Sequence, residues 1–251
     1  MMEAVVFDVD GTLSFNGQVI GAPIVAAIQR LQARGKRVIF ASARLIRDLL
    51  PIIPAFTDQL LIGANGALVA NQGQVQIMAP LSSSHLQQLT AMIDRYQLDY
   101  VVDSEWDYAA RVTTDNLILR QLDPAHLAQK QELSMITSAI KIILLNIPLT
   151  HLADLTTSLQ DQSGLTVIAH TGEANLDITA AGINKATTLA RLGIRKYAAF
   201  GNDQNDLAML AQAQLSIWVT SKPALADLGR TMMIQCAPTA AAVVEQIDAI
   251  R

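Results

Sequence analysis

The pattern that most restricts the fold is an apolar run that ends in two carboxylates: Asp8-Val9-Asp10-Gly11-Thr12-Leu13 directly follows Ala4-Val5-Val6-Phe7. The apolar run predicts a buried β-strand, which ends at Asp8 because burying an unpaired charge is costly. Asp8 and Asp10 point the same way on an extended backbone, and Gly11 permits a tight turn. Two carboxylates therefore converge at the carboxyl edge of a sheet, where open α/β folds bind ligands. The plainer interpretation is a polar loop after a strand.

Strands and helices alternate in the first and last parts of the chain. The early pattern predicts strands at residues 4–7, 37–41, 67–70 and 75–78, the last two as a hairpin, and helices at residues 23–34 and 45–50. The late pattern predicts helices at residues 185–192, 205–211 and 239–250 and strands at residues 196–200 and 215–219. This order predicts an α/β protein with a doubly wound, Rossmann-like parallel sheet.

The middle of the chain has a different pattern, which predicts an inserted α+β module. Its expected helices are residues 82–97, 124–130 and 149–160, and its expected strands are residues 99–103, 109–113, 140–145, 165–169 and 175–178. We therefore expect a core domain in residues 1–80 and 183–251, split by the module in residues 81–182.

Composition excludes several classes of function. The 251 residues are 51% hydrophobic with a net charge of −4, so a large core is expected and a nucleic-acid-binding surface is not. A single cysteine, Cys236, rules out an internal disulfide, and we expect it in the core. The sequence has no signal-peptide pattern and no apolar stretch of about 18 residues, which predicts a cytoplasmic protein without a membrane partner. Dinucleotide and P-loop fingerprints and a histidine cluster for zinc are absent.

Four polar elements fall at predicted strand ends or helix starts of the split domain: Asp8 with Asp10, Ser42, Lys185, and the segment Gly201-Asn202-Asp203-Gln204-Asn205-Asp206. A carboxylate can be a covalent nucleophile for a phosphoryl group, and nearby cations must then offset like-charge repulsion. Carboxylate and carbonyl oxygens suit Mg²⁺, while a lysine and a serine hydroxyl suit phosphoryl oxygens. Taken singly, Ser42 fits a helix cap, Lys185 a solvated helix residue and the last segment an Asx-rich turn.

These motifs together resemble the haloacid dehalogenase-like (HAD) phosphatase superfamily, in its Cof-type, class IIB sugar-phosphatase-like branch. The first motif is Asp8 to Leu13 and the second is Ala41-Ser42-Ala43-Arg44. Further matches are Asn65-Gly66-Ala67, Asp177-Ile178 followed by Gly182-Ile183-Asn184-Lys185, and Gly201 to Asp206. The resemblance spans the whole chain, and the place of the inserted module matches the α/β cap of this branch.

The resemblance implies a role for each matched residue. Asp8 would take the phosphoryl group, and Asp10 would protonate the leaving oxygen and later deprotonate the attacking water. Ser42 and Lys185 would hold the phosphoryl oxygens, and the remaining predicted phosphate- and substrate-binding residues are Gly11, Ala43, Arg44 and Asn205. Mg²⁺ would be bound by Asp8, by the main-chain carbonyl of Asp10 and by the fourth motif, from which Asn202, Asp203 and Asp206 are the candidates.

The chain departs from the branch at three places. The fourth motif usually reads Gly-Asp-x-x-Asn-Asp, but Asn202 stands at its first acidic position and Asp203 follows. Either Asn202 ligates Mg²⁺ through its amide oxygen with Asp206 as the acidic partner, or the loop shifts so that Asp203 supplies the carboxylate. The second motif has Ser42 and Ala43 where threonine and glycine are usual. Trp218-Val219-Thr220-Ser221 replaces a usual Gly-Asn-Ala loop, which would alter substrate access.

The sequence therefore predicts a Mg²⁺-dependent phosphatase that acts on a small phosphorylated metabolite, such as a sugar phosphate, through an aspartyl-phosphate intermediate. The alternative is a catalytically weak phosphate-ligand-binding or regulatory protein on the same fold, which Asn202 keeps open. Phosphotransfer between sugar hydroxyls uses the same core residues, but relatives of that kind usually carry a different cap. The expected assembly is a monomer or a homodimer.

Overall fold

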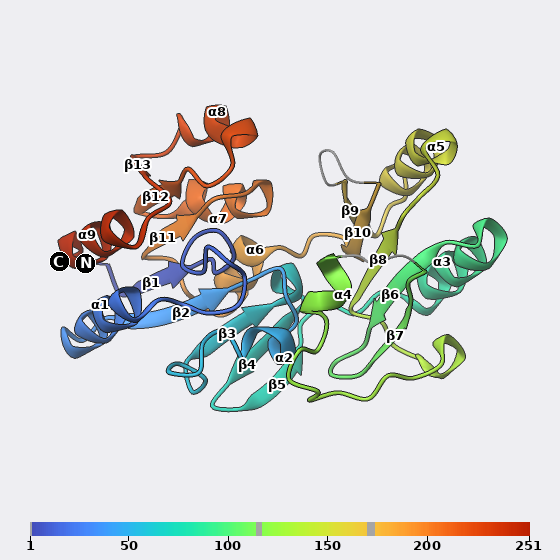
Figure 1. Cartoon of the computed structure of the whole chain (residues 1–251), viewed down its shortest axis with the longest axis horizontal. Coiled ribbons are helices and arrows are strands. Elements are labelled where there is room, and N and C mark those ends of the chain that lie inside the picture. Colours follow the sequence, from blue (N-terminus) through green and yellow to red (C-terminus); the bar gives the residue numbers. More distant parts are fainter. Residues whose placement is uncertain (1, 114–116, 170–173) are drawn as a thin grey trace. The chain divides into compact units, whose positions relative to one another are not determined.

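The structure is a computed structural model that describes residues 2–113, 117–169 and 174–251 (Figure 1). The chain divides into two compact units, which we call the core unit (Met1–Gln74 with Asn184–Arg251) and the inserted unit (Val75–Ile183). The core unit is thus built from two segments that are far apart in the sequence. The assignment of residues 1–80 and 183–251 to a catalytic domain, and of residues 81–182 to a cap, stays a prediction.

An eight-stranded sheet in the order β13-β12-β11-β1-β2-β3-β4-β5 organises the core unit. Six neighbouring strands from β13 to β3 are parallel, and β4 runs antiparallel to β3. The division between the two units falls within β5. The strands are β1 (Ala4–Phe7), β2 (Arg37–Ala41), β3 (Leu60–Gly63), β4 (Leu68–Asn71), β5 (Gln74–Ile77), β11 (Tyr197–Gly201), β12 (Leu215–Val219) and β13 (Ile234–Cys236). This is the expected α/β fold with a Rossmann-like parallel sheet.

Helices cover both faces of the parallel strands, with α1 packed against α9 and α6 packed against α7 (Figure 1). The helices are α1 (Ala22–Ala33), α2 (Ile46–Leu49), α6 (Lys185–Arg191), α7 (Leu207–Gln212), α8 (Ala226–Gly229) and α9 (Ala240–Ala249). No helix among the described residues is long and apolar enough to span a membrane.

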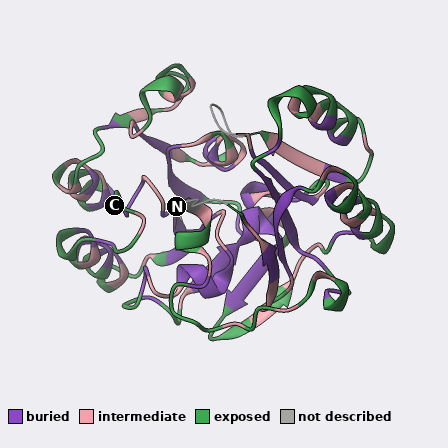
Figure 2. Ribbon diagram, turned by 45° about the vertical axis from the view of Figure 1, so that its right-hand side comes forward, coloured by how far each residue is buried: buried purple, intermediate pink, exposed green. Residues whose placement is uncertain are grey.

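The central strands are buried on both faces, which explains their continuous apolar sequence. All four residues of β1 are buried, and the ring of Phe7 packs against those of Phe40 in β2 and Phe200 in β11, with centroids 6.1 and 4.9 Å away. In the ribbon coloured by burial, the sheet is mostly purple and the helices turn green faces outward (Figure 2). The buried end of β1 therefore positions the polar residues that follow it.

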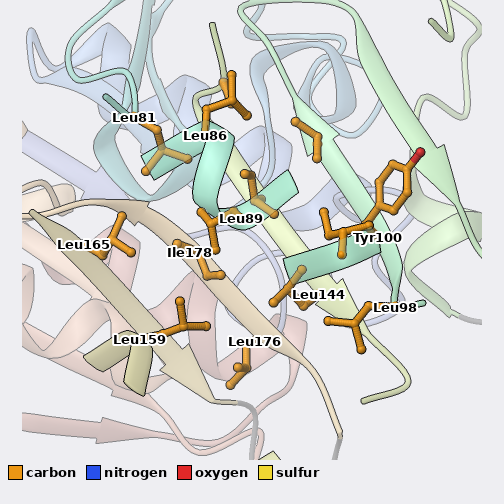
Figure 3. Packing of buried hydrophobic residues seen from close by; sticks show 14 of the residues in the cluster. Leu81, Leu86, Leu89, Leu98, Tyr100, Leu144, Leu159, Leu165, Leu176 and Ile178 are labelled. Atoms are coloured by element: carbon orange, nitrogen blue, oxygen red, sulfur yellow. The ribbon is translucent and has the colours of Figure 1, made fainter. Parts of the chain in front are cut away.

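The inserted unit is an antiparallel sheet in the order β7-β6-β8-β10-β9. Its strands are β6 (Asp99–Asp103), β7 (Tyr108–Arg111), β8 (Lys141–Leu145), β9 (Leu165–Ala169) and β10 (Leu176–Ala180), and its helices are α3 (Ser83–Tyr96), α4 (Leu117–Gln121) and α5 (Leu149–Gln160). Apolar side chains from α3, α5 and one face of the sheet form its core, where Leu89, Leu144 and Ile178 lie near one another (Figure 3). The unit thus has a hydrophobic core of its own.

The structure differs from the sequence prediction at residues 124–130 and at residues 60–63. The predicted helix at residues 124–130 is wrong, because the carboxylate of Asp123 accepts hydrogen bonds from the backbone N–H groups of Leu127 and Ala128 and holds this segment as a loop. Strand β3 was not predicted, although Leu60-Leu61-Ile62 is a short apolar run. It lies beside β2 and extends the parallel sheet.

Candidate active site

Asp8 is fixed at the carboxyl end of β1 by the backbone around it. Its N–H donates to the carbonyl of Phe200 in β11 at 3.0 Å. The chain then turns sharply, with the N–H groups of Leu13 and Ser14 both donating to the carbonyl of Val9 at 2.9 Å. Gly11 has a φ of +77°, and a Cβ there would lie 2.2 Å from the side-chain amide of Asn202. The turn therefore requires glycine for its conformation and for the approach of the loop after β11.

Lys185 joins the two halves of the core unit at this point. Its ammonium lies 2.7 Å from Asp8 Oδ1 and 2.6 Å from Asp206 Oδ1, and its side chain has no exposed surface. Asp8 Oδ2 accepts a hydrogen bond of 2.7 Å from the hydroxyl of Thr12. Two buried carboxylates therefore share one ammonium, and the cluster keeps an excess negative charge.

The start of α6 places Lys185. The side chain of Asn184 caps this helix by accepting from the N–H of Thr187 at 2.9 Å, and Thr187 returns the contact to the N–H of Asn184. The helix start packs against Gly66, where a Cβ would lie 2.5 Å from the carbonyl oxygen of Asn184. Thr188 also donates to the carbonyl of Gly66 at 2.7 Å. The loop of residues 64–66 thus holds the first turn of α6 in place.

Asp206 organises the loop after β11. Its Oδ2 accepts hydrogen bonds from the backbone N–H groups of Asn202 at 2.9 Å and Asp203 at 3.1 Å, while its Oδ1 faces Lys185. The side chain has no exposed surface. Both carboxylate oxygens are thus engaged within the protein, which favours a structural role in shaping this loop.

In this cluster the two carboxylates of Asp8 and Asp206 outnumber the single ammonium of Lys185. Burial, followed by the charge of Asp206, raises the pKa of the Asp8 carboxyl to about 7, although Lys185 and Thr12 act in the opposite direction. Burial by itself lowers the pKa of Lys185, but the carboxylates of Asp206 and Asp8 outweigh it and raise this pKa above its usual value. Lys185 is therefore protonated at neutral pH, and an added positive charge would favour the ionised form of Asp8.

Asp10 belongs to a second, more accessible ion pair. The Nε and Nη2 atoms of Arg44 donate to the two carboxylate oxygens of Asp10, each at 2.7 Å, and Nη2 also donates to the carbonyl of Gly17 at 2.9 Å. The side chain of Asp10 is 38% exposed. The hydroxyl of Ser42 accepts a hydrogen bond of 3.0 Å from the backbone N–H of Arg44 and so positions Arg44. Ser42 does not cap α2. The guanidinium thus orients a carboxylate that solvent can reach.

The side-chain amide of Asn202 reaches the same place from the loop after β11. One terminal atom of the amide lies 3.1 Å from Asp8 Oδ2, 3.1 Å from the main-chain oxygen of Asp10 and 3.2 Å from the hydroxyl of Thr12. Its other terminal atom lies 2.6 Å from Ser221 Oγ. Without a cation, these hydrogen bonds are satisfied when the amide nitrogen faces Asp8 and the amide oxygen faces Ser221.

The same atoms form a donor set that suits a divalent cation when the amide oxygen faces Asp8. The carboxylate of Asp8, the main-chain oxygen of Asp10 and the amide oxygen of Asn202 are the hard ligands that Mg²⁺ prefers. The separation of 3.1 Å is close to the ~3 Å expected between adjacent ligands of an octahedral ion with bonds of about 2.1 Å. No three His, Cys, Asp or Glu side chains gather as a possible metal site among the described residues, so a cation here would depend on the carbonyl and amide oxygens.

Not every predicted site residue lies in this cluster. Asp203 pairs instead with the exposed Lys222 and caps the turn at Gln204. The Nδ2 of Asn205 donates to Asn65 Oδ1 at 2.9 Å, across 140 residues of sequence. Ala43 lies between Ser42 and Arg44 in the loop after β2.

The sequence motifs indicate no role for Thr12 or Ser221, although both residues lie within them, and Lys222 lies outside every motif. The hydroxyls of Thr12 and Ser221 gave a weak signal, since hydroxyl groups beside predicted strand ends are frequent. Their partners became visible only when the loops after β1, β11 and β12 were placed together.

Comparison with known proteins identifies the family. The family model for haloacid dehalogenase-like hydrolases matches residues 5–227, so the chain belongs to this family and the sequence-based identification is confirmed. The chain is a hydrolase-family protein, and structural relatives include phosphatases. A search of curated proteins found no match.

Solved structures share the fold along the whole chain at low sequence identity. A haloacid dehalogenase-like hydrolase from B. subtilis has a TM-score of 0.82 and 14% identity, with 100% of each chain covered. SMU.1108c from Streptococcus mutans UA159 has a TM-score of 0.81 and 20% identity, covering 99% of this chain and 98% of that one. The HAD subclass IIB sugar phosphatase BT4131 has a TM-score of 0.78 and 18% identity, covering 98% and 97%. At these identities the likeness establishes the fold.

Proposed function

We propose that this protein is a Mg²⁺-dependent phosphatase that hydrolyses a small phosphorylated metabolite through an aspartyl-phosphate on Asp8. The observation that carries the proposal is the buried contact of 2.7 Å between Asp8 Oδ1 and the ammonium of Lys185. This contact holds a carboxylate oxygen beside a buried positive charge at the end of a buried strand. Phosphoryl transfer needs a nucleophile and a cation in that arrangement.

The reaction then follows in two displacements. An oxygen of Asp8 attacks phosphorus, the bond from phosphorus to the ester oxygen breaks, and Asp10 gives its proton to the leaving oxygen. A water molecule next attacks the phosphorus of the aspartyl-phosphate while Asp10 takes one of its protons. The bond from phosphorus to Asp8 breaks, and inorganic phosphate and the free carboxylate are released. Asp10 ends this cycle in the protonation state in which it began.

The surrounding residues fit the other requirements of this chemistry. Lys185 and Ser42 would bind phosphoryl oxygens, and Asn205, held by Asn65, would border the phosphate. Arg44 would keep the Asp10 carboxylate oriented between its two proton transfers. Asp8, the main-chain oxygen of Asp10 and Asn202 would hold Mg²⁺, whose positive charge offsets that of the phosphoryl group and Asp8.

The inserted unit would serve as a cap that selects the substrate and excludes water. A sugar phosphate is the substrate class that we favour, because the structurally similar BT4131 is described as a sugar phosphatase. The likeness covers 98% of this chain, so it includes the inserted unit as well as the core unit.

Release of inorganic phosphate from a panel of sugar phosphates and other phosphorylated metabolites, with Mg²⁺ or with EDTA, tests this proposal. We expect Mg²⁺-dependent release from at least one compound and, after acid quenching, a phosphorylated peptide that contains Asp8. Tight binding of a phosphorylated compound without turnover would instead favour a regulatory protein. Transfer of phosphate to a second hydroxyl, with no free phosphate, would indicate a mutase.

A further inference from the structure

We propose that the side-chain amide of Asn202 turns over when a divalent cation binds, and that Ser221 positions this amide in both states. Without the cation, the amide nitrogen donates to Asp8 and Asp10. With the cation, the amide oxygen faces inward as a ligand. This inference rests on the proposed Mg²⁺ dependence and adds a role for Asn202 and Ser221 in the response of the site to Mg²⁺.

The geometry around the amide supports the first state. The inward atom lies 3.1 Å from Asp8 Oδ2 and 3.1 Å from the main-chain oxygen of Asp10, and both of these atoms are acceptors. A nitrogen at this position donates to both, whereas an oxygen would face two other oxygens. Asn202 is only 2% exposed, so an unfavourable contact would not be relieved by water.

The same geometry supports the second state. An oxygen at the inward position would bring three oxygens from Asn202, Asp8 and Asp10 toward one point, which is unfavourable unless a cation lies there. The amide needs no change in its backbone to exchange the two orientations, since oxygen and nitrogen occupy nearly equivalent places. A cation therefore has to compete only with the hydrogen bonds of the amide.

Ser221 is suited to both orientations because a hydroxyl can donate and accept. Its Oγ lies 2.6 Å from the outward atom of the Asn202 amide. In the cation-free state the hydroxyl donates to the amide oxygen, and in the bound state it accepts from the amide nitrogen. The second contact is the stronger one, because a cation on the amide oxygen makes the N–H groups better donors. Ser221 should therefore favour the cation-bound state.

Asparagine at position 202 has an advantage that aspartate lacks. The amide can donate to Asp8 when no cation is present, whereas a carboxylate at this distance would add a further negative charge to a buried cluster that already carries an excess. Asn202 thus provides hydrogen-bond donors to the cation-free cluster, but it binds a cation less tightly than a carboxylate would. We expect Asn202→Asp to bind Mg²⁺ at least about tenfold more tightly than the unchanged protein, because it adds a charged ligand.

A titration of protein labelled with ¹⁵N-asparagine tests the turnover directly. The side-chain NH₂ resonances of Asn202, identified by their loss in Asn202→Asp, should shift as Mg²⁺ is added and should saturate together with the binding heat in calorimetry. Resonances that stay in place while calorimetry reports full binding would overturn the inference, as would the absence of Mg²⁺ binding. If Asn202→Asp unfolds, sequential resonance assignment of the unchanged protein identifies the same NH₂ group, and its titration remains decisive.

The role of Ser221 is tested with a matched pair of variants. Ser221→Ala removes a hydrogen bond in both states, so Mg²⁺ binding should weaken only by the difference between the two contacts, about twofold to fivefold. Thr220→Val is the control, because Thr220 is the adjacent residue and its hydroxyl donates to the carbonyl of Cys236 instead. Equal Mg²⁺ affinities of the two variants would contradict a role for Ser221. If Mg²⁺ moves the Asn202 resonances but no compound is hydrolysed, the inference stands and the proposed function fails.

Discussion

The loops after β1 and β11 each place an aspartate against the same lysine, but the two aspartates are held by different kinds of contact. Asp206 binds Lys185 with one oxygen and accepts two backbone N–H groups with the other. Asp8 binds Lys185 with one oxygen, while its other oxygen contacts the side chains of Thr12 and Asn202. Backbone contacts cannot be exchanged without refolding the loop, but side-chain contacts can. One carboxylate is therefore part of the scaffold, and the other is free to change partners.

Because Asp8 is the carboxylate that can change partners, Asp8→Asn should have the largest effect on activity. An amide cannot take over as a nucleophile, so phosphate release from the best substrate should fall by about 10³-fold or more. The variant should nevertheless fold, because it removes one charge from a buried cluster with excess negative charge. Phosphate release and thermal unfolding, measured on the same preparation, check both halves of this prediction. An activity above a tenth of the original would exclude Asp8 as the nucleophile.

Asp206→Asn should show the opposite behaviour and mainly affect stability. Its amide would present a donor either to the ammonium of Lys185 or to the N–H groups of Asn202 and Asp203, and each of these is also a donor. The free energy of unfolding in urea should therefore fall by about 2 kcal/mol. Asp8→Asn serves as the control, since it changes the other partner of the same lysine. If the two variants were equally stable, the distinction between scaffold and exchangeable carboxylate would be lost.

The same distinction explains what the sequence could predict. Asp8 and Lys185 follow from local patterns, because each stands where an element ends or begins, and the resemblance gave both a role. The pair of Asn65 with Asn205 and the contact of Ser221 with Asn202 join loops that are far apart in the chain. No local period encodes such contacts, so they needed the placed strands. Periodicity alone does not distinguish the short apolar run of β3 from a helix segment.

Substitution of Arg44 tests the role of Asp10, the second carboxylate of the loop after β1. Arg44→Lys keeps the charge but removes the two parallel hydrogen bonds of 2.7 Å to Asp10, so Asp10 should be less well oriented for proton transfer. We expect kcat to fall about tenfold with a smaller change in KM. Arg30→Lys is the matched control, because Arg30 makes a similar paired contact with Asp248 at an exposed site. Similar kcat values for both variants would exclude the positioning role of Arg44.

The pH dependence of the free energy of unfolding should reveal the raised pKa of Asp8. The folded protein raises the pKa of Asp8 from 3.8 to about 7, so it binds protons that the unfolded chain releases between these values. In EDTA, this group makes the protein less stable as pH rises from about 4 to 7, with no further change above that range. Asp8→Asn has no carboxyl group at this position, so its stability does not fall over this pH range. We expect the melting temperature of Asp8→Asn minus that of the unchanged protein to be roughly 2–4 °C larger at pH 8 than at pH 5. A difference that does not vary with pH would contradict the raised pKa.

The smallest effect is expected for Asp203, the other acidic residue of the β11 loop. Its carboxylate pairs with Lys222 and accepts the N–H of Gln204, and both contacts lie at the surface. Exposed ion pairs contribute little, so Asp203→Asn should change Mg²⁺ affinity less than about twofold and stability by less than about 1 kcal/mol. Calorimetry with Mg²⁺, run beside Asn202→Asp, provides the measurement. A loss of Mg²⁺ binding in Asp203→Asn would instead mean that the loop shifts to bring this carboxylate inward, and the metal would then belong to Asp203 instead of Asn202.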